Sequence, residues 1–432
     1  MVNLIRLATC CCTGLFTLWN QGLAADWNEY RGPANNGISE EKVSYQWPVQ
    51  GPKILWKSQA SNGFSSFSIA QGKAFTLISA MREGALQEVC VAYDAASGKE
   101  VWSAPLGVAK YQGGGDDGRK DNNGGDGPRS TPVVESGRVY VYSSDMVLSC
   151  LDASTGKVQW TQDILKAFQG QNISWKNATS PVIDGNLVFV GGGGAGQSLL
   201  AFAKATGKLV WQTGEEKMTH ATPVPATIEG VRQIVFFMQS GLVSVSREDG
   251  KVLWKFPFRF NVSTAASPVV AGNMVYCSAG YGVGAALAKI TKSGSSFSAE
   301  EVWRLTGNKP VANHWSTPIY HNGHLYGMFS FKEYGEGPLK CVELATGKVK
   351  WEQPGFGSGN VIAASGKIIA LSDDGRLVIV EATPAGYKEL AQAKVVGGKC
   401  WSTPSLSGGK LFVRSTKEAV CLDLTSSLSQ VR

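Results

Sequence analysis

A repeated pair of sequence marks constrains the fold of this chain most strongly. The first mark is a Ser/Thr-Pro dipeptide that opens an apolar run. The second is a Thr/Ser-Gly-Lys turn, or a close variant, with a tryptophan four residues after the glycine. Successive prolines of the first mark are 49, 42, 45 and 50 residues apart, and a last interval of 86 residues corresponds to two units. The clear copies are Thr131-Pro132, Ser180-Pro181, Thr222-Pro223, Ser267-Pro268, Thr317-Pro318 and Thr403-Pro404.

Weaker copies of the first mark near Phe67-Ser68 and Asn360-Val361 bring the number of units to eight. Units of 40–50 residues that consist of short alternating runs are typical of β-propellers, with one four-stranded sheet per unit. In the second unit we expect strands at 133–134, 138–142 and 146–152, with a fourth through Trp160. The sequence therefore predicts an all-β, eight-bladed propeller of four-stranded antiparallel blades. An open solenoid or two separate β-domains remain alternatives.

The two ends of the repeat region complement each other. The eighth unit stops after its third strand, near Cys421-Leu422-Asp423, whereas Ile54-Leu55-Trp56 is a strand with no partner before it. Pairing these segments would remove open sheet edges and close the ring. We therefore divide the chain into a signal peptide (1–25), an N-terminal segment (26–53) and the propeller (54–432).

The first 25 residues have the pattern of a secretory signal. Arg6 precedes an apolar run from Leu7 to Trp19, and Gly22-Leu23-Ala24-Ala25 offers small residues for cleavage before Asp26. The run is too short for a transmembrane helix, and no later stretch reaches about 18 apolar residues. We expect a periplasmic or secreted protein without a transmembrane span. An ordinary N-terminal helix, or a lipoprotein anchored at Cys10, are the alternatives.

Charge and cysteine usage exclude other classes of protein. The net charge is +7, but there is no dense run of Lys or Arg, so nucleic-acid binding is not expected. The six cysteines after the signal form no CxxC pair, which argues against a zinc knuckle or a redox dithiol. Three of them, Cys150, Cys341 and Cys421, share one position in the repeat, so we expect buried, unpaired thiols there. His321 and His324 flank an Asn-Gly hairpin turn, and we expect no metal site.

The repeat unit, a small residue and an acid before Thr/Ser-Gly-Lys-x-x-Trp, resembles the tryptophan-docking repeat of pyrroloquinoline quinone (PQQ) type propellers. The resemblance covers about residues 54–432 and is greatest to secreted bacterial propellers of the BamB-like group. Segments 27–33, 127–132, 278–284, 313–318 and 400–404 carry it outside the repeat. It implies a structural role, filling the wedge between blades, for the repeated tryptophans Trp56, Trp102, Trp160, Trp211, Trp254, Trp303 and Trp351.

A candidate binding site follows from the residues just before each Ser/Thr-Pro. The first strand of a propeller blade is innermost, so these residues should surround one mouth of the central channel. They are basic and aromatic and include no Asp or Glu, which suits an anionic or sugar-like ligand. The candidates are Arg129, Trp175, Asn177, His220, Asn313, His314, Trp315 and Trp401. The alternative is that these side chains only plug the channel.

We expect a non-catalytic binding or scaffold protein of the cell envelope, monomeric, with envelope proteins or a small anionic or sugar ligand as partners. No cofactor, metal or catalytic residue is expected. One alternative implied by the resemblance is a PQQ-dependent oxidoreductase, which would need Ca²⁺ on carboxylate and amide oxygens and an Asp base. Another is polysaccharide recognition at the channel mouth. The Gly113–Gly127 insertion is interpreted as a solvated loop that could cover the mouth beside Arg129.

Overall fold

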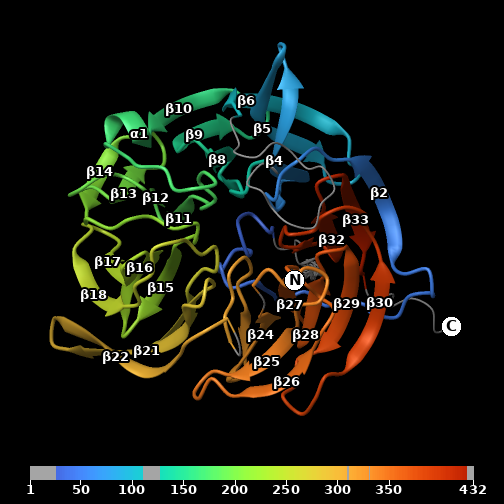
Figure 1. Cartoon of the computed structure of the whole chain (residues 1–432). Coiled ribbons are helices and arrows are strands. Elements are labelled where there is room, and N and C mark those ends of the chain that lie inside the picture. Colours follow the sequence, from blue (N-terminus) through green and yellow to red (C-terminus); the bar gives the residue numbers. More distant parts are fainter. Residues whose placement is uncertain (1–25, 110–126, 309–310, 330, 426–432) are drawn as a thin grey trace, which may run out of the picture.

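Eight antiparallel sheets stand around a central axis in the computed structural model, which describes residues 26–109, 127–308, 311–329 and 331–425 (Figure 1). Seven sheets have four strands, and the eighth gains a fifth, parallel strand from the N-terminal segment. The predicted eight-bladed propeller is confirmed. The signal peptide prediction for 1–25, and nearly all of the predicted loop at 113–127, fall outside the described residues.

In blades 1 to 6 the four strands follow one another along the chain, from the channel outward, whereas blades 7 and 8 each add a strand from the N-terminal end of the chain. Blades 1 to 4 consist of β3 (Ser68–Ala70), β4 (Lys73–Arg82), β5 (Ala85–Asp94) and β6 (Glu100–Val108); β7 (Val133–Glu135), β8 (Arg138–Tyr142), β9 (Val147–Asp152) and β10 (Val158–Asp163); β11 (Val182–Asp184), β12 (Leu187–Gly191), β13 (Leu199–Ala203) and β14 (Leu209–Thr213); and β15 (Val224–Ile228), β16 (Val231–Met238), β17 (Gly241–Ser246) and β18 (Val252–Pro257). Blades 5 to 8 consist of β19 (Val269–Ala271), β20 (Met274–Ala279), β21 (Gly284–Ser293) and β22 (Ser296–Leu305); β23 (Ile319–His321), β24 (His324–Met328), β25 (Leu339–Glu343) and β26 (Val349–Gln353); β27 (Asn360–Ala364), β28 (Lys367–Leu371), β29 (Arg376–Glu381) and β30 (Glu389–Lys394), with β1 (Ile38–Ser39); and β31 (Ser405–Ser407), β32 (Lys410–Arg414) and β33 (Glu418–Asp423), with β2 (Lys53–Gln59).

The ring closes through the two ends of the repeat region, as predicted. Strand β2 pairs antiparallel with β33, with Ile54 opposite Leu422 and Trp56 opposite Cys421. Figure 1 shows the blue strand β2 beside the red strand β33. The only helix of the described residues is α1 (Ile164–Ala167), and no helix there is long and apolar enough to cross a membrane.

The repeated tryptophans join each blade to the next one. The Trp102 indole N–H donates to the carbonyl of Ala153 at 3.1 Å, and that of Trp160 donates to the carbonyl of Lys204 at 3.2 Å. Both acceptors lie in the Thr-Gly-Lys turn of the following blade. A Cβ atom on Gly207 in that turn would lie 2.6 Å from the Trp160 ring. The turn thus needs glycine for its left-handed φ of +68° and for the ring that covers it.

Trp254 departs from this pattern because blade 5 has a long β21–β22 hairpin instead of the Thr-Gly-Lys turn. Its indole N–H donates to the Gln233 side-chain oxygen of its own blade at 2.6 Å. The same oxygen accepts the Ser244 hydroxyl, and the Gln233 amide donates to two backbone carbonyls of the β15–β16 hairpin. Arg304 from β22 lies over the Phe256 ring of β18. The fully buried Gln233 side chain therefore supplies the acceptor that a turn carbonyl of the next blade supplies to the other tryptophans.

Five hydroxyls at the Ser/Thr-Pro marks or the equivalent position link neighbouring blades around the channel. Each of these oxygens accepts the backbone N–H of the matching residue one blade earlier. Ser66 occupies this place in blade 1, one residue before the predicted pair. The bonds run from Thr403 N to Ser66 Oγ (2.9 Å), Ser66 N to Thr131 Oγ1 (3.1 Å), Thr131 N to Ser180 Oγ (2.9 Å), Ser180 N to Thr222 Oγ1 (3.0 Å) and Ser267 N to Thr317 Oγ1 (2.9 Å). We refer to the five acceptors Ser66, Thr131, Ser180, Thr222 and Thr317 as the hydroxyl belt.

The N-terminal segment crosses the centre of the ring (dark blue in Figure 1). Trp27 forms an isolated bridge with Ile69 of blade 1, and β1 pairs with β27 of blade 7. Between them the Arg31 guanidinium donates to the backbone carbonyls of Thr317 (2.6 Å) and Pro318 (3.0 Å) in blade 6. This segment therefore connects blades 1, 6 and 7, which are far apart in the sequence.

All six cysteines of the described residues are buried and unpaired. Cys150, Cys341 and Cys421 each lie opposite a repeat tryptophan on the neighbouring strand, across from Trp160, Trp351 and Trp56 respectively. Burial raises the pKa of the Cys150 and Cys341 thiols to about 11. The prediction of buried thiols at one repeat position is confirmed.

Candidate functional site at the channel mouth

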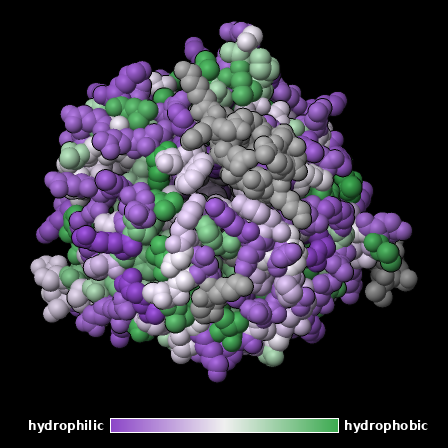
Figure 2. Space-filling view, in the orientation of Figure 1, coloured by the Kyte–Doolittle hydropathy of each residue, from purple (hydrophilic) through white to green (hydrophobic). Residues whose placement is uncertain are grey.

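A cavity of about 150 Å³ opens at the centre of one face of the ring, where the loops before the innermost strands meet. Figure 2 shows the hollow at the centre of this face. Six of the eight predicted site residues line it: Arg129, Trp175, His220, His314, Trp315 and Trp401. The other lining residues are Tyr30, Phe64, Ser66, Ala178, Ser180, Thr222, Ser263, Ala265, Tyr281, Lys332, Tyr334 and Thr403.

The two predicted asparagines form hydrogen bonds with backbone groups and do not line the cavity. The Asn177 amide donates to the carbonyl of Ser143 at 3.2 Å, and its oxygen accepts the N–H of Thr179 at 3.0 Å. The Asn313 amide donates to the carbonyl of Met328 at 2.8 Å, and its oxygen accepts the Tyr276 hydroxyl at 2.7 Å. Both side chains are buried, so they position the loops that carry the neighbouring lining residues.

One side of the cavity is a group of nearly parallel aromatic rings. The Trp315 and Trp401 ring centroids are 5.2 Å apart at 12°, and Tyr334 lies 5.5 Å from Trp401 at 9°. Phe64 stacks on Trp401 at 5.0 Å. We refer to Phe64, Trp315, Tyr334 and Trp401 as the aromatic wall. Because it combines rings from blades 1, 6 and 8, it depends on the closed ring.

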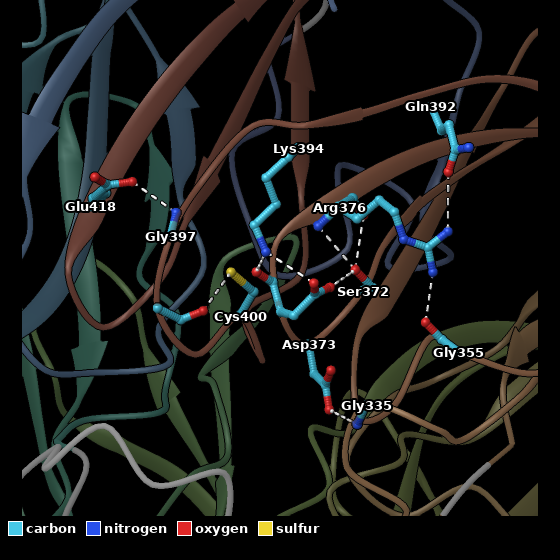
Figure 3. Close-up of polar contacts among 12 residues, drawn as sticks. Gly335, Gly355, Ser372, Asp373, Arg376, Gln392, Lys394, Gly397, Cys400 and Glu418 are labelled. Carbon is cyan, nitrogen blue, oxygen red and sulfur yellow. Dashed lines mark hydrogen bonds and ion pairs between the residues drawn. The ribbon is translucent and has the colours of Figure 1, made fainter.

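Asp373, in the β28–β29 turn, holds two loops of this wall together. Its carboxylate accepts the backbone N–H of Gly335 at 2.9 Å, next to Tyr334 (Figure 3). Its backbone carbonyl accepts the N–H of Cys400 at 2.8 Å, next to Trp401. One residue of blade 7 therefore fixes ring-bearing loops of blades 6 and 8.

On another part of the cavity lining, His220 is held in one tautomer. Its Nε2 lies 2.9 Å from the carbonyl oxygen of Lys176, which can only accept, so this nitrogen carries the proton. Its Nδ1 accepts the Ser263 hydroxyl at 2.7 Å. Burial and the nearby Arg129 guanidinium lower the pKa of His220 to about 4, so the imidazole is neutral near pH 7.

The backbone beside His220 is in an uncommon conformation. Trp175 and Lys176 both have a φ of +66°, which is costly for residues with a side chain. The two carbonyls are used at once, because that of Trp175 accepts Arg129 Nη1 at 2.6 Å and that of Lys176 faces His220. An ion pair of 2.7 Å between Lys176 and Asp145 also anchors this turn. The strained turn therefore orients both a cation and an imidazole at the cavity.

His314 is also neutral. Its Nδ1 accepts the N–H of Gly280 at 3.2 Å, and the rings of Tyr281 and Trp315 lie about its imidazole at 5.1 and 5.0 Å. Burial, together with the nearby His220 and Lys332, lowers its pKa to about 3. The proton of the neutral ring therefore resides on Nε2, which makes this nitrogen a hydrogen-bond donor.

The cavity is poorly suited to Ca²⁺ and a Ca²⁺-bound quinone. Ca²⁺ takes six to eight oxygen ligands and favours carboxylates. Among the described lining residues there is no Asp or Glu, whereas Arg129 and Lys332 both carry positive charge. The described part of the chain also contains no group of three or more His, Cys, Asp or Glu residues placed to hold a metal ion. These residues do not fit the calcium–PQQ centre of the alternative function.

Several residues of the site were not among the predicted ones: Tyr30, Tyr281, Lys332, Tyr334 and Asp373. Tyr30 and Tyr281 lie in segments already noted for their resemblance, so that signal was available for them. Lys332 and Tyr334 lie in the connection between β24 and β25, whose length exceeds a tight hairpin turn. Asp373 lies in the short connection between β28 and β29, and no sequence pattern marks it as part of a site.

The fold and the cavity define a PQQ-like propeller whose channel mouth is a potential binding pocket. The PQQ_2 family model, described as outer membrane protein assembly factor BamB, matches residues 86–353, more than half of the chain. The chain belongs to this family.

The chain is also similar to curated proteins. The chain is 25% identical over 289 residues to tetrathionate hydrolase of Acidithiobacillus ferrooxidans, covering 65% of this chain but only 49% of that protein. It is 24% identical over 295 residues to BamB of Moranella endobia, covering 66% and 69% respectively.

Among solved structures, BamB from Moraxella catarrhalis superposes with a TM-score of 0.58 at 14% identity, over 88% of this chain and 99% of that chain. Quinohemoprotein alcohol dehydrogenase ADHIIG from Pseudomonas putida HK5 superposes with a TM-score of 0.64 at 13% identity, over 94% and 82%. At these identities the two structures show the shared fold alone.

Proposed function

We propose that this protein is a non-catalytic binding propeller of the cell envelope, and that its channel-mouth cavity is a site for a small anionic or sugar ligand. Membership of the BamB family supports a binding or scaffold role with envelope proteins as partners. The observation that carries the ligand site is the lining itself. Aromatic rings and the cations Arg129 and Lys332 surround the cavity, and no Asp or Glu among the described residues lines it.

The chemistry of the lining argues for binding over catalysis. A general base needs a free acceptor with a suitable pKa. His220 has both ring nitrogens engaged, and His314 is protonated on the nitrogen that remains open. The Ser263 hydroxyl is directed at His220 and also accepts the His220 backbone N–H at 3.1 Å. These groups orient the loops and side chains of the site and are not placed to transfer protons.

The alternative of a quinoprotein oxidoreductase draws on the shared fold with alcohol dehydrogenases. The two functions predict different results for the purified mature chain. With Ca²⁺ present, the proposed function predicts no stoichiometric heat on titration of PQQ and no turnover in a dye-linked alcohol oxidation assay. Stoichiometric binding with dye reduction would overturn the proposed function.

The ligand site itself is tested by an Arg129→Ala/Trp315→Ala double variant. Against a panel of small anions and sugar acids, binding by the wild type and loss of binding by a folded double variant are expected. Unchanged binding by the double variant would exclude the channel mouth as the site. Circular dichroism and urea unfolding serve as the control for folding, and a Trp160→Phe variant at a blade interface serves as the control for a tryptophan substitution away from the cavity.

A further inference from the structure

The hydroxyl belt gives the cavity a surface that donates hydrogen bonds. Ser66, Ser180 and Thr222 belong to the belt and line the cavity. Each of their oxygens accepts one backbone N–H, and none donates to another group within the residues that the structure describes. Their O–H hydrogens are therefore available to a ligand. The N–H bond received by each oxygen also polarises its hydroxyl and strengthens it as a donor.

Three further polar groups of the lining can act only as donors toward a ligand. His314 Nε2 carries the ring proton and makes no hydrogen bond within the described chain, while Arg129 and Lys332 can only donate. The two backbone carbonyls of the strained turn are already used by Arg129 and His220. A sugar hydroxyl needs both an acceptor and a donor, whereas a carboxylate needs donors only. Because these donors lie beside two cations, and no Asp or Glu among the described residues lines the cavity, the lining favours a carboxylate over an uncharged polyol.

Size and shape restrict the ligand further. A cavity of about 150 Å³ is the size that holds one benzene ring. The four rings of the aromatic wall stack on one another at one side of the cavity, and a flat aromatic ring suits contact with such a group. Trp175 comes from the loop before blade 3, on the other side of the ring from blades 6 to 8. A single flat ring fits these dimensions, and a fused three-ring system exceeds them.

We propose that the cavity binds a monocyclic aromatic carboxylate, with its carboxylate on the hydroxyls of Ser66, Ser180 and Thr222 and its ring against the aromatic wall. This inference rests on the proposed function, because it names the class of ligand for the same site. Arg129 and Lys332 add positive charge at the cavity, which favours the ionised form of the ligand.

The first test uses the mature wild-type protein and three probes in titration calorimetry. Benzoate has the proposed ring and charge, benzamide has the same shape with N–H donors and no charge, and glucuronate has the charge on a saturated polyol ring. Benzoate is expected to bind one molecule per chain, at least roughly 10-fold more tightly than the other two. Equal binding of benzamide would overturn the role of the carboxylate and needs no variant.

The second test separates the cavity hydroxyls from the structural role of the belt. Thr222→Val and Thr317→Val each remove one hydroxyl that accepts a neighbouring backbone N–H, at 3.0 and 2.9 Å. Only Thr222 lines the cavity. Thr222→Val should weaken benzoate roughly 10-fold, while Thr317→Val should leave its affinity unchanged. Equal effects of the two variants would overturn the placement of the carboxylate.

The outcomes distinguish the two levels of the proposal. Tighter binding of glucuronate than of benzoate would overturn the aromatic carboxylate and leave the ligand site of the proposed function in place. If none of the three probes binds while the panel of anions and sugar acids contains a binder lost in the Arg129→Ala/Trp315→Ala variant, only the inference fails. If no member of either set binds, both fail.

Discussion

At the scale of single residues, the glycine of each Thr-Gly-Lys turn and the tryptophan of the preceding blade act as one unit. The glycine is required by the left-handed backbone and by the indole ring above it. The indole N–H in turn ends on a carbonyl of the same turn, so the ring is fixed in position as well as buried. The glycine and tryptophan of the repeat pattern therefore indicate a contact between two neighbouring blades.

This contact predicts unequal costs for two glycine substitutions. Gly207→Ala would place a Cβ 2.6 Å from the Trp160 ring, whereas Gly230→Ala would meet nothing within 4 Å. Their φ values, +68° and +74°, impose similar backbone strain. Gly207→Ala should therefore lower the free energy of unfolding by about 1–3 kcal/mol more than Gly230→Ala, as measured by urea unfolding. Equal losses would show that the ring moves freely away.

At the scale of elements, the N-terminal segment is a cross-brace inside the ring. It contacts inner strands of blades 1 and 7 through Trp27 and β1, and blade 6 through the Arg31 guanidinium. Tyr30, next to Arg31, also lines the cavity. The segment thus connects the stability of the ring to the shape of the candidate site.

Arg31→Met tests this brace. The guanidinium is 3% exposed and donates to three backbone carbonyls, which would lose their partners. We expect a loss of about 2–4 kcal/mol in the free energy of unfolding, since buried acceptors left unsatisfied are costly. Arg232→Met is the control, because that side chain is 41% exposed in its ion pair with Asp184 and should cost at most about 1 kcal/mol. Equal losses in urea unfolding would contradict a bracing role.

At the scale of the whole molecule, two kinds of buried group give stability opposite dependences on pH. His220 and His314 have pKa values lowered from 6.5 to about 4 and about 3, mainly by burial. Below pH 6.5 both imidazoles are protonated in the unfolded chain but remain neutral in the folded chain. The free energy of unfolding therefore falls as the pH falls. Burial raises the pKa of Glu29 from 4.5 to about 8, so the folded chain keeps a proton that the unfolded chain releases. That contribution to stability falls as the pH rises from 4.5 to 8.

The sum predicts a maximum of stability near pH 6.5. Each group changes the free energy of unfolding by up to about 1.4 kcal/mol per pH unit. Below pH 6.5 the loss of stability from the two histidines exceeds the gain from Glu29. Between pH 6.5 and 8 only the Glu29 contribution changes. Urea unfolding from pH 5 to 8 would measure this curve. Glu29→Gln should remove the decline between pH 6.5 and 8 and leave the acid side in place. A decline that persists in this variant would exclude Glu29 as its cause.

Much of the architecture was predictable because it depends on local sequence patterns that recur in each repeat. Gly207 and Trp160 mark a turn and a strand within a few dozen residues of each other, and such spacings recur in each clear copy of the second mark. Trp254 shows the limit of this reasoning. It has the same mark as the other tryptophans, but its partner is Gln233 because the next blade has no matching turn.

For the candidate site, sequence reasoning located the loops but not every side chain in them. The position three residues before proline placed Arg129, His220, Trp315 and Trp401 at one mouth, because each blade repeats the same path from loop to inner strand. Asn313 shares its loop with Trp315, yet it is directed into the backbone. The orientation of a loop side chain depends on neighbouring residues from other blades. No local sequence pattern predicts it.

The class of fold, the number of blades and the closure of the ring follow from the sequence, since strand periodicity and turn chemistry act over short distances. That Phe64, Tyr334 and Trp401 form one wall, that Tyr30 lines the same cavity, and that Asp373 joins two of its loops became evident from the folded ring. These groups are up to several hundred residues apart. They meet because a closed ring brings the same edge of every blade to one axis, and their contacts depend on packing around that axis.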